Sequence, residues 1–260
     1  MIEFAQVSRA YGDKLAVAEL DLVVAAGELF ALLGPNGAGK TTTIKMMVGL
    51  LHPSSGHVRI CGHDVVRETR QANRLLGYVP DEPYLYDKLS GREFLAFVGD
   101  MHGMERKEAA ARIDREVQDF QLAPFLDDRT ETYSHGMKQR LAFAAALLHD
   151  PTVLVVDEPM VGLDPRSMRL AKDLLRAKAS RGMTVFMSTH SLAVVEEIAD
   201  RIGILEQGRM KFLGTLAELR RRLSHDHTSL EQLYLELTSA EPSERFASQA
   251  PQEPARSRGA

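Results

Sequence analysis

The chain has 260 residues, 44% of them hydrophobic and 26% charged, a balance typical of a soluble globular protein with a full core. Its net charge of -4 argues against a nucleic-acid partner, because binding driven by phosphate neutralisation needs a basic excess or a basic face. A single cysteine excludes an internal disulfide framework, and the absence of any run of about 18 uncharged apolar residues excludes a membrane span.

The N-terminal part of the chain alternates between strand and turn patterns. Residues 2–11 and 15–24 alternate in polarity as short strands do, and the solid apolar run at 28–33 predicts a buried strand. A glycine-rich loop follows, and residues 40–51 carry apolar side chains at helical spacing. Residues 57–65 predict a strand and a turn.

The middle of the chain has a helical pattern from about residue 87 to residue 149. Ser90 and Glu93 form a capping box ahead of an apolar segment, which predicts a helix start. Residues 104–122 are rich in good helix formers and amphipathic, which predicts a second helix. We therefore expect a helical subdomain at about 87–149.

The last third of the chain returns to short apolar strands. The segments at 153–157 and 184–189 are β-branched and apolar, as buried parallel strands are. Residues 239–260 are small, polar and proline-bearing, so we expect a disordered tail there and a single folded unit at 1–238.

The glycine loop matches the phosphate-loop pattern of a glycine, four residues and then Gly-Lys-Thr. In such a loop backbone N–H groups turn toward phosphates, the lysine reaches the β and γ phosphates, and the threonine hydroxyl ligates Mg²⁺. Its position between a predicted strand and a predicted helix is the context that this chemistry requires. The residues expected to bind the nucleotide here are Gly34, Pro35, Asn36, Gly37, Ala38, Gly39, Lys40, Thr41 and Thr42.

Two carboxylates end the strand at 153–157. Asp157 occupies the usual place for the residue that holds Mg²⁺ near a bound triphosphate. Glu158 follows at the carboxyl end of the strand, where it can orient or deprotonate the water that attacks the γ-phosphate. Together with the phosphate loop, this pair predicts a nucleoside triphosphate and magnesium as cofactors.

The segment Tyr133-Ser134-His135-Gly136-Met137 distinguishes among phosphate-loop proteins. A kinase or GTPase leaves it unexplained, and the chain lacks an Asn-Lys-x-Asp run for nucleobase specificity. With the motifs on both sides, the chain resembles the ATP-binding subunit of ABC (ATP-binding cassette) transporters of the bacterial exporter type, over residues 1 to 238. Ser134 and Gly136 match that family's "LSGGQ" segment, whereas His135 and Met137 depart from it.

The resemblance implies a role for four further residues. Tyr11 is similar to the aromatic residue that stacks on adenine, and Asp164 to the aspartate that couples the two sites of a dimer. His190 is similar to the histidine that contacts the γ-phosphate. Asp81 stands where the family has a glutamine that ligates Mg²⁺ and senses the membrane partner, so we expect Asp81 to reach the metal through water.

The resemblance also implies a fold, partners and a place in the cell. The expected fold is α/β, with a RecA-like phosphate-loop core, an N-terminal antiparallel β part and an inserted helical subdomain. Two ATP-binding subunits, identical or related, would close head to tail on ATP, with Ser134, His135 and Gly136 acting on the nucleotide of the other chain. An integral membrane permease would hold the protein at the inner face of the cell membrane, and the direction of transport would be export. The alternative is a soluble regulatory ABC-type ATPase that is not coupled to transport.

Overall fold

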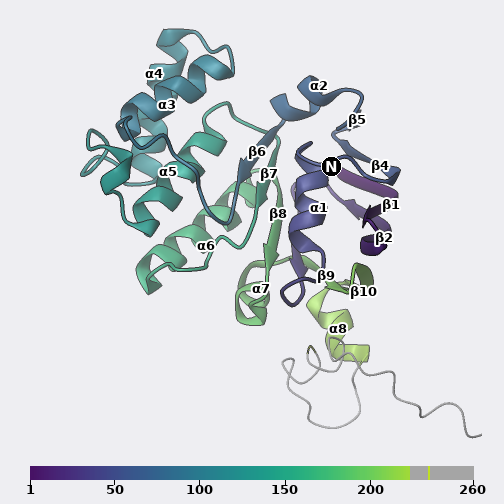
Figure 1. Ribbon diagram of the computed structural model, residues 1–260. Helices are drawn as coiled ribbons and strands as arrows, with labels where there is room; N and C mark the ends of the chain where they lie inside the picture. The colour runs from purple at the N-terminus through teal and green to yellow at the C-terminus, as the bar shows by residue number, and fades with distance from the viewer. Residues whose placement is uncertain (223–233, 235–260) are drawn as a thin grey trace, which may run out of the picture.

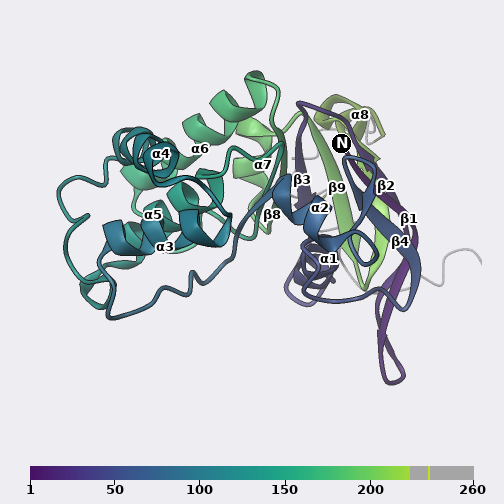
Figure 2. The ribbon, with the colours of Figure 1, turned by 90° about the horizontal axis from the view of Figure 1, so that it is seen from above.

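The computed structural model describes residues 1–222 and 234. Two β-sheets and a group of helices make up the fold (Figure 1). Seen from above, helices α3, α4 and α5 lie on one side, strands β1, β2 and β4 on the other, and β3, β8 and β9 between them (Figure 2). The tail expected at 239–260 lies outside the described residues.

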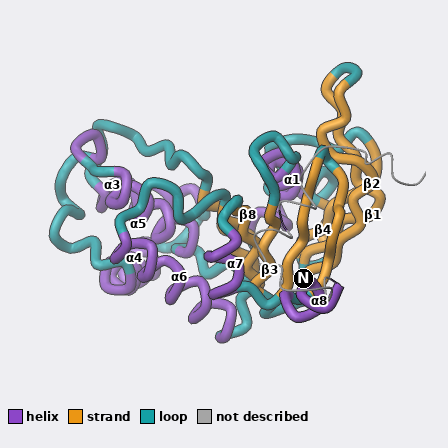
Figure 3. Tube along the Cα trace, turned by 90° about the horizontal axis from the view of Figure 1, so that it is seen from below, coloured by secondary structure: helices purple, strands orange, loops and turns teal. Residues whose placement is uncertain are grey.

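The N-terminal sheet is antiparallel and has the order β2-β1-β4-β5. Strands β1 (Ile2–Tyr11) and β2 (Lys14–Val24) form a long hairpin, and β4 (Ser55–Ile60) pairs with β1 on its other edge. The short strand β5 (His63–Asp64) completes it. The strands expected at 2–11 and 15–24 are therefore confirmed, and the antiparallel β part is clear in Figure 3.

The central sheet has the order β10-β9-β3-β8-β7-β6, and its strands from β9 to β6 run parallel. Three of its strands, β3 (Leu29–Leu33), β7 (Val153–Val156) and β8 (Thr184–Thr189), are buried along their whole length. Strands β6 (Leu76–Val79) and β9 (Arg201–Glu206) flank them, and β10 (Arg209–Gly214) adds an antiparallel edge.

Alternate side chains of β3 belong to two different hydrophobic cores, because successive residues of a strand point to opposite faces. Leu29, Ala31 and Leu33 join the core shared with the helices, whereas Phe30 and Leu32 join the core beneath the antiparallel sheet. A strand buried on both faces reads as an unbroken apolar run, which is why the sequence at 28–33 predicts it without alternation.

Helices cover both faces of the central sheet. Helix α1 (Lys40–Met47) packs in the core on the side of the antiparallel sheet, and α6 (Pro165–Ser180) and α7 (Leu192–Ile198) pack on the other side. Short helices α2 (Thr69–Arg74) and α8 (Leu216–Arg222) lie at β5 and β10. Neither α2 nor β6 was anticipated from the sequence, since each spans too few residues to carry a clear period.

The segment expected to be helical contains α3 (Gly91–Met101), α4 (Arg106–Asp119), a 3-10 turn (Thr130–Thr132) and α5 (His135–Leu147). The predicted capping box is confirmed: the Ser90 hydroxyl accepts the Glu93 N–H, and the Glu93 carboxylate accepts the Ser90 N–H at 2.8 Å. The division of residues 1–238 into a core and a helical subdomain remains a prediction.

Helix α5 lies so close to β6 that only glycine fits between them. A Cβ atom at Gly77 would lie 2.2 Å from the carbonyl oxygen of Ala146, a backbone atom that cannot yield without moving α5. Gly77→Ala should therefore lower the free energy of unfolding by about 1–3 kcal/mol through overpacking. Urea denaturation measures it.

The matched control is Gly99→Ala in α3, where the added Cβ atom would meet only side-chain atoms, the nearest at 3.2 Å. This change should cost less, since alanine also favours the helix by about 1 kcal/mol relative to glycine. Equal losses in the two variants would show that the close approach of α5 to β6 is not what requires Gly77.

Candidate nucleotide site

The phosphate loop depends on two glycines for reasons of space. A Cβ atom at Gly34 would lie 2.4 Å from the carbonyl oxygen of Leu205, and one at Gly39 would lie 2.5 Å from that of Ala16. Gly39 also has a φ of 110°, in the region that favours glycine. The loop therefore packs tightly against β9 and β2 while its open side faces a cavity.

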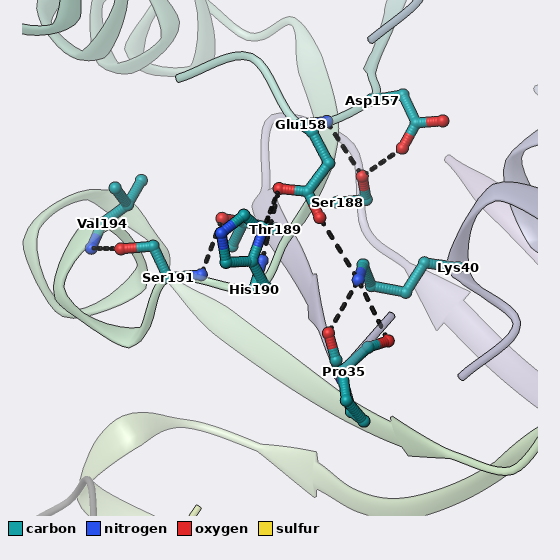
Figure 4. A network of polar contacts seen from close by, with 10 residues as sticks. Pro35, Lys40, Asp157, Glu158, Ser188, Thr189, His190, Ser191 and Val194 are labelled. Atoms are coloured by element: carbon teal, nitrogen blue, oxygen red, sulfur yellow. Dashed lines mark hydrogen bonds and ion pairs between the residues drawn. The ribbon is translucent and has the colours of Figure 1, made fainter. Parts of the chain in front are cut away.

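Lys40 begins α1 and is almost completely buried, with 6% of its surface exposed. Its ammonium group donates hydrogen bonds to the carbonyl oxygens of Gly34 at 2.7 Å and Pro35 at 3.4 Å. It also forms an ion pair with the Glu158 carboxylate, with Nζ and Oε1 3.2 Å apart (Figure 4). The charge of Lys40 is thus compensated within the chain.

Strand β8, which pairs with β7, positions Glu158. Its backbone has a φ of 46°, unusual for a residue with a side chain, and its N–H donates to the Ser188 hydroxyl at 3.0 Å. The same hydroxyl donates to the Asp157 carboxylate at 2.5 Å. One serine on β8 therefore anchors both carboxylates at the end of β7.

The second oxygen of the Glu158 carboxylate faces His190. Its Oε2 lies 2.9 Å from the His190 Nδ1 atom and 3.3 Å from the His190 backbone nitrogen, which donates to it. His190 is about half exposed, so its ring extends from the end of β8 toward solvent. Figure 4 shows the resulting chain of contacts from Lys40 through Glu158 to His190.

A cavity of about 650 Å³ opens above the phosphate loop, a size that suits a nucleotide-like ligand. Tyr11 lies at its rim with 48% of its surface exposed, and the Arg9 guanidinium lies 4.8 Å from the centre of the Tyr11 ring. The cavity is lined by Tyr11, Lys14, Leu15, Ala16, Pro35, Asn36, Gly37, Gly39, Lys40, Thr41, Thr42, Asp81, Glu158, Gln207 and Gly208.

Asp81 brings a third carboxylate toward Asp157 and Glu158. Asp157 is hydrogen-bonded to β6 through its backbone N–H, which donates to the Val79 carbonyl at 2.9 Å, so the ends of β6 and β7 are level. Desolvation first, and then the negative charges of Asp157 and Glu158, raise the pKa of the Asp81 carboxyl group. A divalent cation at this point would relieve the repulsion that raises it.

Ser134, His135 and Gly136 lie elsewhere in the described chain and do not line this cavity. The Ser134 hydroxyl caps α5 by accepting the Met137 N–H at 3.4 Å. The His135 Nε2 atom lies 3.0 Å from the Val161 carbonyl oxygen, which ties the start of α5 to the loop after Glu158. His135, the residue that departs from the family pattern, thus has a structural contact.

Asp164 caps α6 and is likewise absent from the cavity wall. Its carboxylate accepts the backbone N–H groups of Arg166 at 2.9 Å and Ser167 at 3.0 Å, and the Ser167 hydroxyl at 2.6 Å. The hydrogen bond from the Ser167 side chain is the largest of the contacts that lower the pKa of Asp164.

Several residues of the site escaped the sequence analysis. No local sequence pattern indicates that Ser188 bonds residues about thirty positions earlier in the chain. Gln207 and Gly208 line the cavity from the turn between β9 and β10. Tyr234 lies near Glu158: burial first, and then the charge of Glu158, raise the pKa of its phenol.

The described residues contain no cluster of three His, Cys, Asp or Glu side chains around one point, so no metal site is complete from the protein alone. Magnesium in phosphate sites is commonly held by one or two carboxylates together with the phosphates, so such a cluster is not required. Within the same residues, none of the helices combines the length and the apolar character needed to cross a bilayer.

Comparison with known proteins identifies the family. The ABC transporter family model matches residues 17–161. The chain is 40% identical over 226 residues to the linearmycin resistance ATP-binding protein LnrL of Bacillus subtilis, covering 87% of this chain and 73% of that one. It is 41% identical over 208 residues to the Nod factor export ATP-binding protein I of Burkholderia lata, covering 80% and 68%.

Solved structures agree. An ATP-binding subunit of an ABC transporter superposes with a TM-score of 0.85 at 33% identity, covering 92% of this chain and all of that one. A bacterial ABC transporter cassette solved as a dimer gives a TM-score of 0.77 at 25% identity, covering 83% and 99%. The chain therefore belongs to the ABC transporter family, as an ATP-binding subunit that hydrolyses ATP to drive transport, and the predicted fold class is confirmed.

The raised pKa of Asp81 predicts how stability depends on pH. Because the pKa of Asp81 is raised on folding, its ionisation opposes folding: this penalty is absent below about pH 4 and appears as the pH rises through the raised pKa. Without nucleotide or magnesium, Asp81→Asn should raise the free energy of unfolding at pH 7, by less than about 1 kcal/mol because Asp81 is exposed.

The gain should shrink toward zero near pH 4, and urea denaturation at both pH values measures it. Asp100→Asn, at an exposed position on α3, is the matched control and should leave both values unchanged. A destabilised Asp81→Asn chain at pH 7 would contradict the repulsion between the carboxylates.

Proposed function

We propose that this chain powers an exporter, by binding Mg²⁺-ATP between two ATP-binding subunits and transmitting its hydrolysis to an integral membrane permease. The observation that carries the proposal is the contact chain Lys40–Glu158–His190, of which Lys40 and Glu158 line the nucleotide cavity. In this arrangement Lys40 supplies a cation for the phosphate, Glu158 a general base, and His190 a polar contact to that base.

Lys40 and Glu158 pair with each other beside the phosphate loop. One carboxylate oxygen of Glu158 faces the Lys40 ammonium group and the other faces His190. A γ-phosphate that attracts Lys40 frees the first oxygen, which can then accept a proton from the attacking water. His190 keeps its contact with the second oxygen and so fixes the direction of the carboxylate.

Thr41, Asp157 and Asp81 are the residues that would hold magnesium. Their hydroxyl and carboxylate oxygens are the ligand type that Mg²⁺ prefers, and the raised pKa of Asp81 marks a place where negative charge lacks a counterion. When bound, the ion would neutralise charge on the phosphates. The hydrogen bond from the Ser188 hydroxyl fixes the position of the Asp157 carboxylate for this role.

The Ser134 segment supports a site shared between two chains. Ser134, His135 and Gly136 have no place at the cavity of their own chain, although they present a capped helix start, which is an anion-binding element. We propose that in a head-to-tail dimer they face the γ-phosphate held by Lys40 of the other subunit, with Asp164 in the adjoining loop. The relatives that have been solved as dimers favour this arrangement.

The names of the relatives support a role in export. The similar proteins are named for linearmycin resistance, Nod factor export and daunorubicin resistance. We propose that this chain likewise serves export and is held at the inner face of the membrane by a separate membrane-spanning subunit.

A tagged pull-down from detergent-solubilised native membranes, followed by mass spectrometry, tests the transporter assignment. A polytopic membrane protein recovered in stoichiometric amount would support it and would identify the permease. Recovery in the soluble fraction with cytosolic proteins alone would favour a regulatory ATPase that is uncoupled from transport.

Glu158→Gln tests the general base. The variant should bind ATP as the native chain does, lose about 10²–10⁴-fold in turnover because the amide cannot accept the proton, and accumulate an ATP-bound dimer. Glu105→Gln, at an exposed position before α4 that makes no cap hydrogen bond, is the matched control. A Glu158→Gln chain that stays monomeric by light scattering with ATP and magnesium would contradict the shared site.

Ser134→Arg tests the action across the dimer. The variant should lose hydrolysis and retain ATP binding, since Ser134 is absent from the cavity of its own chain. Mixing Ser134→Arg chains with Lys40→Ala chains should restore about a quarter of native turnover, because half of the dimers then carry one intact site of two. Mixtures as inactive as either variant alone would contradict the action of Ser134 across the dimer.

A further inference from the structure

A second polar cavity, of about 560 Å³, lies between α5, α6 and the loop at 121–125. The nucleotide cavity and this one share no lining residue. Three arginines line it: Arg140 from α5, and Arg166 and Arg169 from the first turns of α6. Of its lining residues, Asp164 alone has a role in the function proposed above, and the arginines have none.

Arg140 is the unusual member of the group. Its Nε atom is buried without a hydrogen-bond partner, and among the described residues its guanidinium forms no ion pair. It stacks 4.8 Å from the centre of the Phe125 ring and makes one long hydrogen bond, 3.4 Å, to the Gln121 carbonyl oxygen. A partly buried cation without an anion is unfavourable, and burial accordingly lowers the pKa of Arg140.

The acidic residues of the cavity do not meet this need. The Asp164 carboxylate is occupied by the N–H groups and the hydroxyl at the start of α6, and Asp173 pairs with Arg169 at 3.9 Å. Arg166 is exposed and, within the described chain, has no ion pair. Arg140 and Arg166 thus line one cavity without an ion pair among the described residues, although the charge of Asp164 acts on Arg140 from a greater distance.

We infer that this cavity is a second anion site, in which Arg140 and Arg166 bind the dianion of a phosphate group, either free phosphate or a phosphorylated small molecule. Guanidinium groups match phosphate oxygens in pairs, and a phosphate monoester offers three strong acceptor oxygens to the two arginines that form no ion pair. A carboxylate offers only two oxygens. The volume also falls within the range of small-molecule sites.

A ligand here would join two parts of the protein. Arg140 belongs to the helix that Ser134 begins, whereas Arg166 belongs to the helix that Asp164 begins. A phosphate held by both arginines would therefore fix the start of α6 relative to α5. This inference is independent of the export assignment and requires only the single chain.

A calorimetric titration of the full chain with inorganic phosphate tests the inference. The native chain should show two classes of site, one removed by Lys40→Ala and the other by Arg166→Gln. Loss of one charge-assisted contact of about 1.5–3 kcal/mol corresponds to a roughly 10–100-fold weaker affinity at the second site. Arg181→Gln, at the exposed end of the same helix, is the matched control and should leave both classes unchanged.

Arg140→Gln should weaken the same class of site, and thermal unfolding shows whether this less exposed variant keeps its fold. Acetate, a monoanion, should fail to displace phosphate from that site. A single class of phosphate site that is lost in Lys40→Ala and unchanged in Arg166→Gln would overturn the inference, and so would acetate that competes as well as a phosphate ester.

Discussion

The ion pair between Lys40 and Glu158 joins two residues on either side of the end of β8, and it depends on the order of the strands in the central sheet. Lys40 follows β3 and Glu158 follows β7, with β8 between them in the sheet. Because parallel strands place their carboxyl ends at one edge, residues more than a hundred positions apart in the chain meet within hydrogen-bonding distance. His190, at the end of the intervening strand, completes the row.

The ion pair needs a strained backbone, and the surroundings compensate for it. A non-glycine residue in the left-handed region costs on the order of 1–3 kcal/mol, and Glu158 has a φ of 46°. The Ser188 hydroxyl accepts the Glu158 N–H in that conformation, and two cationic or polar partners hold its carboxylate. Strain of this kind persists only where neighbouring contacts fix it, which is the situation at the end of β7.

The phosphate loop and the carboxylate pair could be predicted from the sequence because each is a local pattern in a recognisable context. The close approach that explains Gly34 could not, since the atom it avoids is the carbonyl oxygen of Leu205, on another strand. Ser188 was missed as an anchor for the same reason. Its role depends on the register of β8 against β7, and the sequence of neither strand specifies that register.

The helix start at Ser90 could be predicted from its cap, whereas several other elements were not predicted, among them the long helix α6 and the short helix α2. The Ser90–Glu93 box is a pair of reciprocal hydrogen bonds between near neighbours, so it needs no tertiary information. Helix α2 and strand β6 have no comparable device, and their place follows from the sheet and from the fit of Gly77 under α5. His135 departs from the family pattern, and its structural role is seen only in its contact with the Val161 carbonyl oxygen.

Lys40, which is buried, and Arg140, which is partly buried, have opposite surroundings. Lys40 is surrounded by carbonyl oxygens and a carboxylate, so a phosphate that binds there must replace existing contacts and in doing so releases Glu158. Arg140 has a ring beneath it and one long hydrogen bond, so an anion that binds there displaces almost nothing. A ligand that must replace existing contacts, as at Lys40, can couple its binding to a change in the protein. A cation without an ion pair, such as Arg140, is suited to holding a ligand in place.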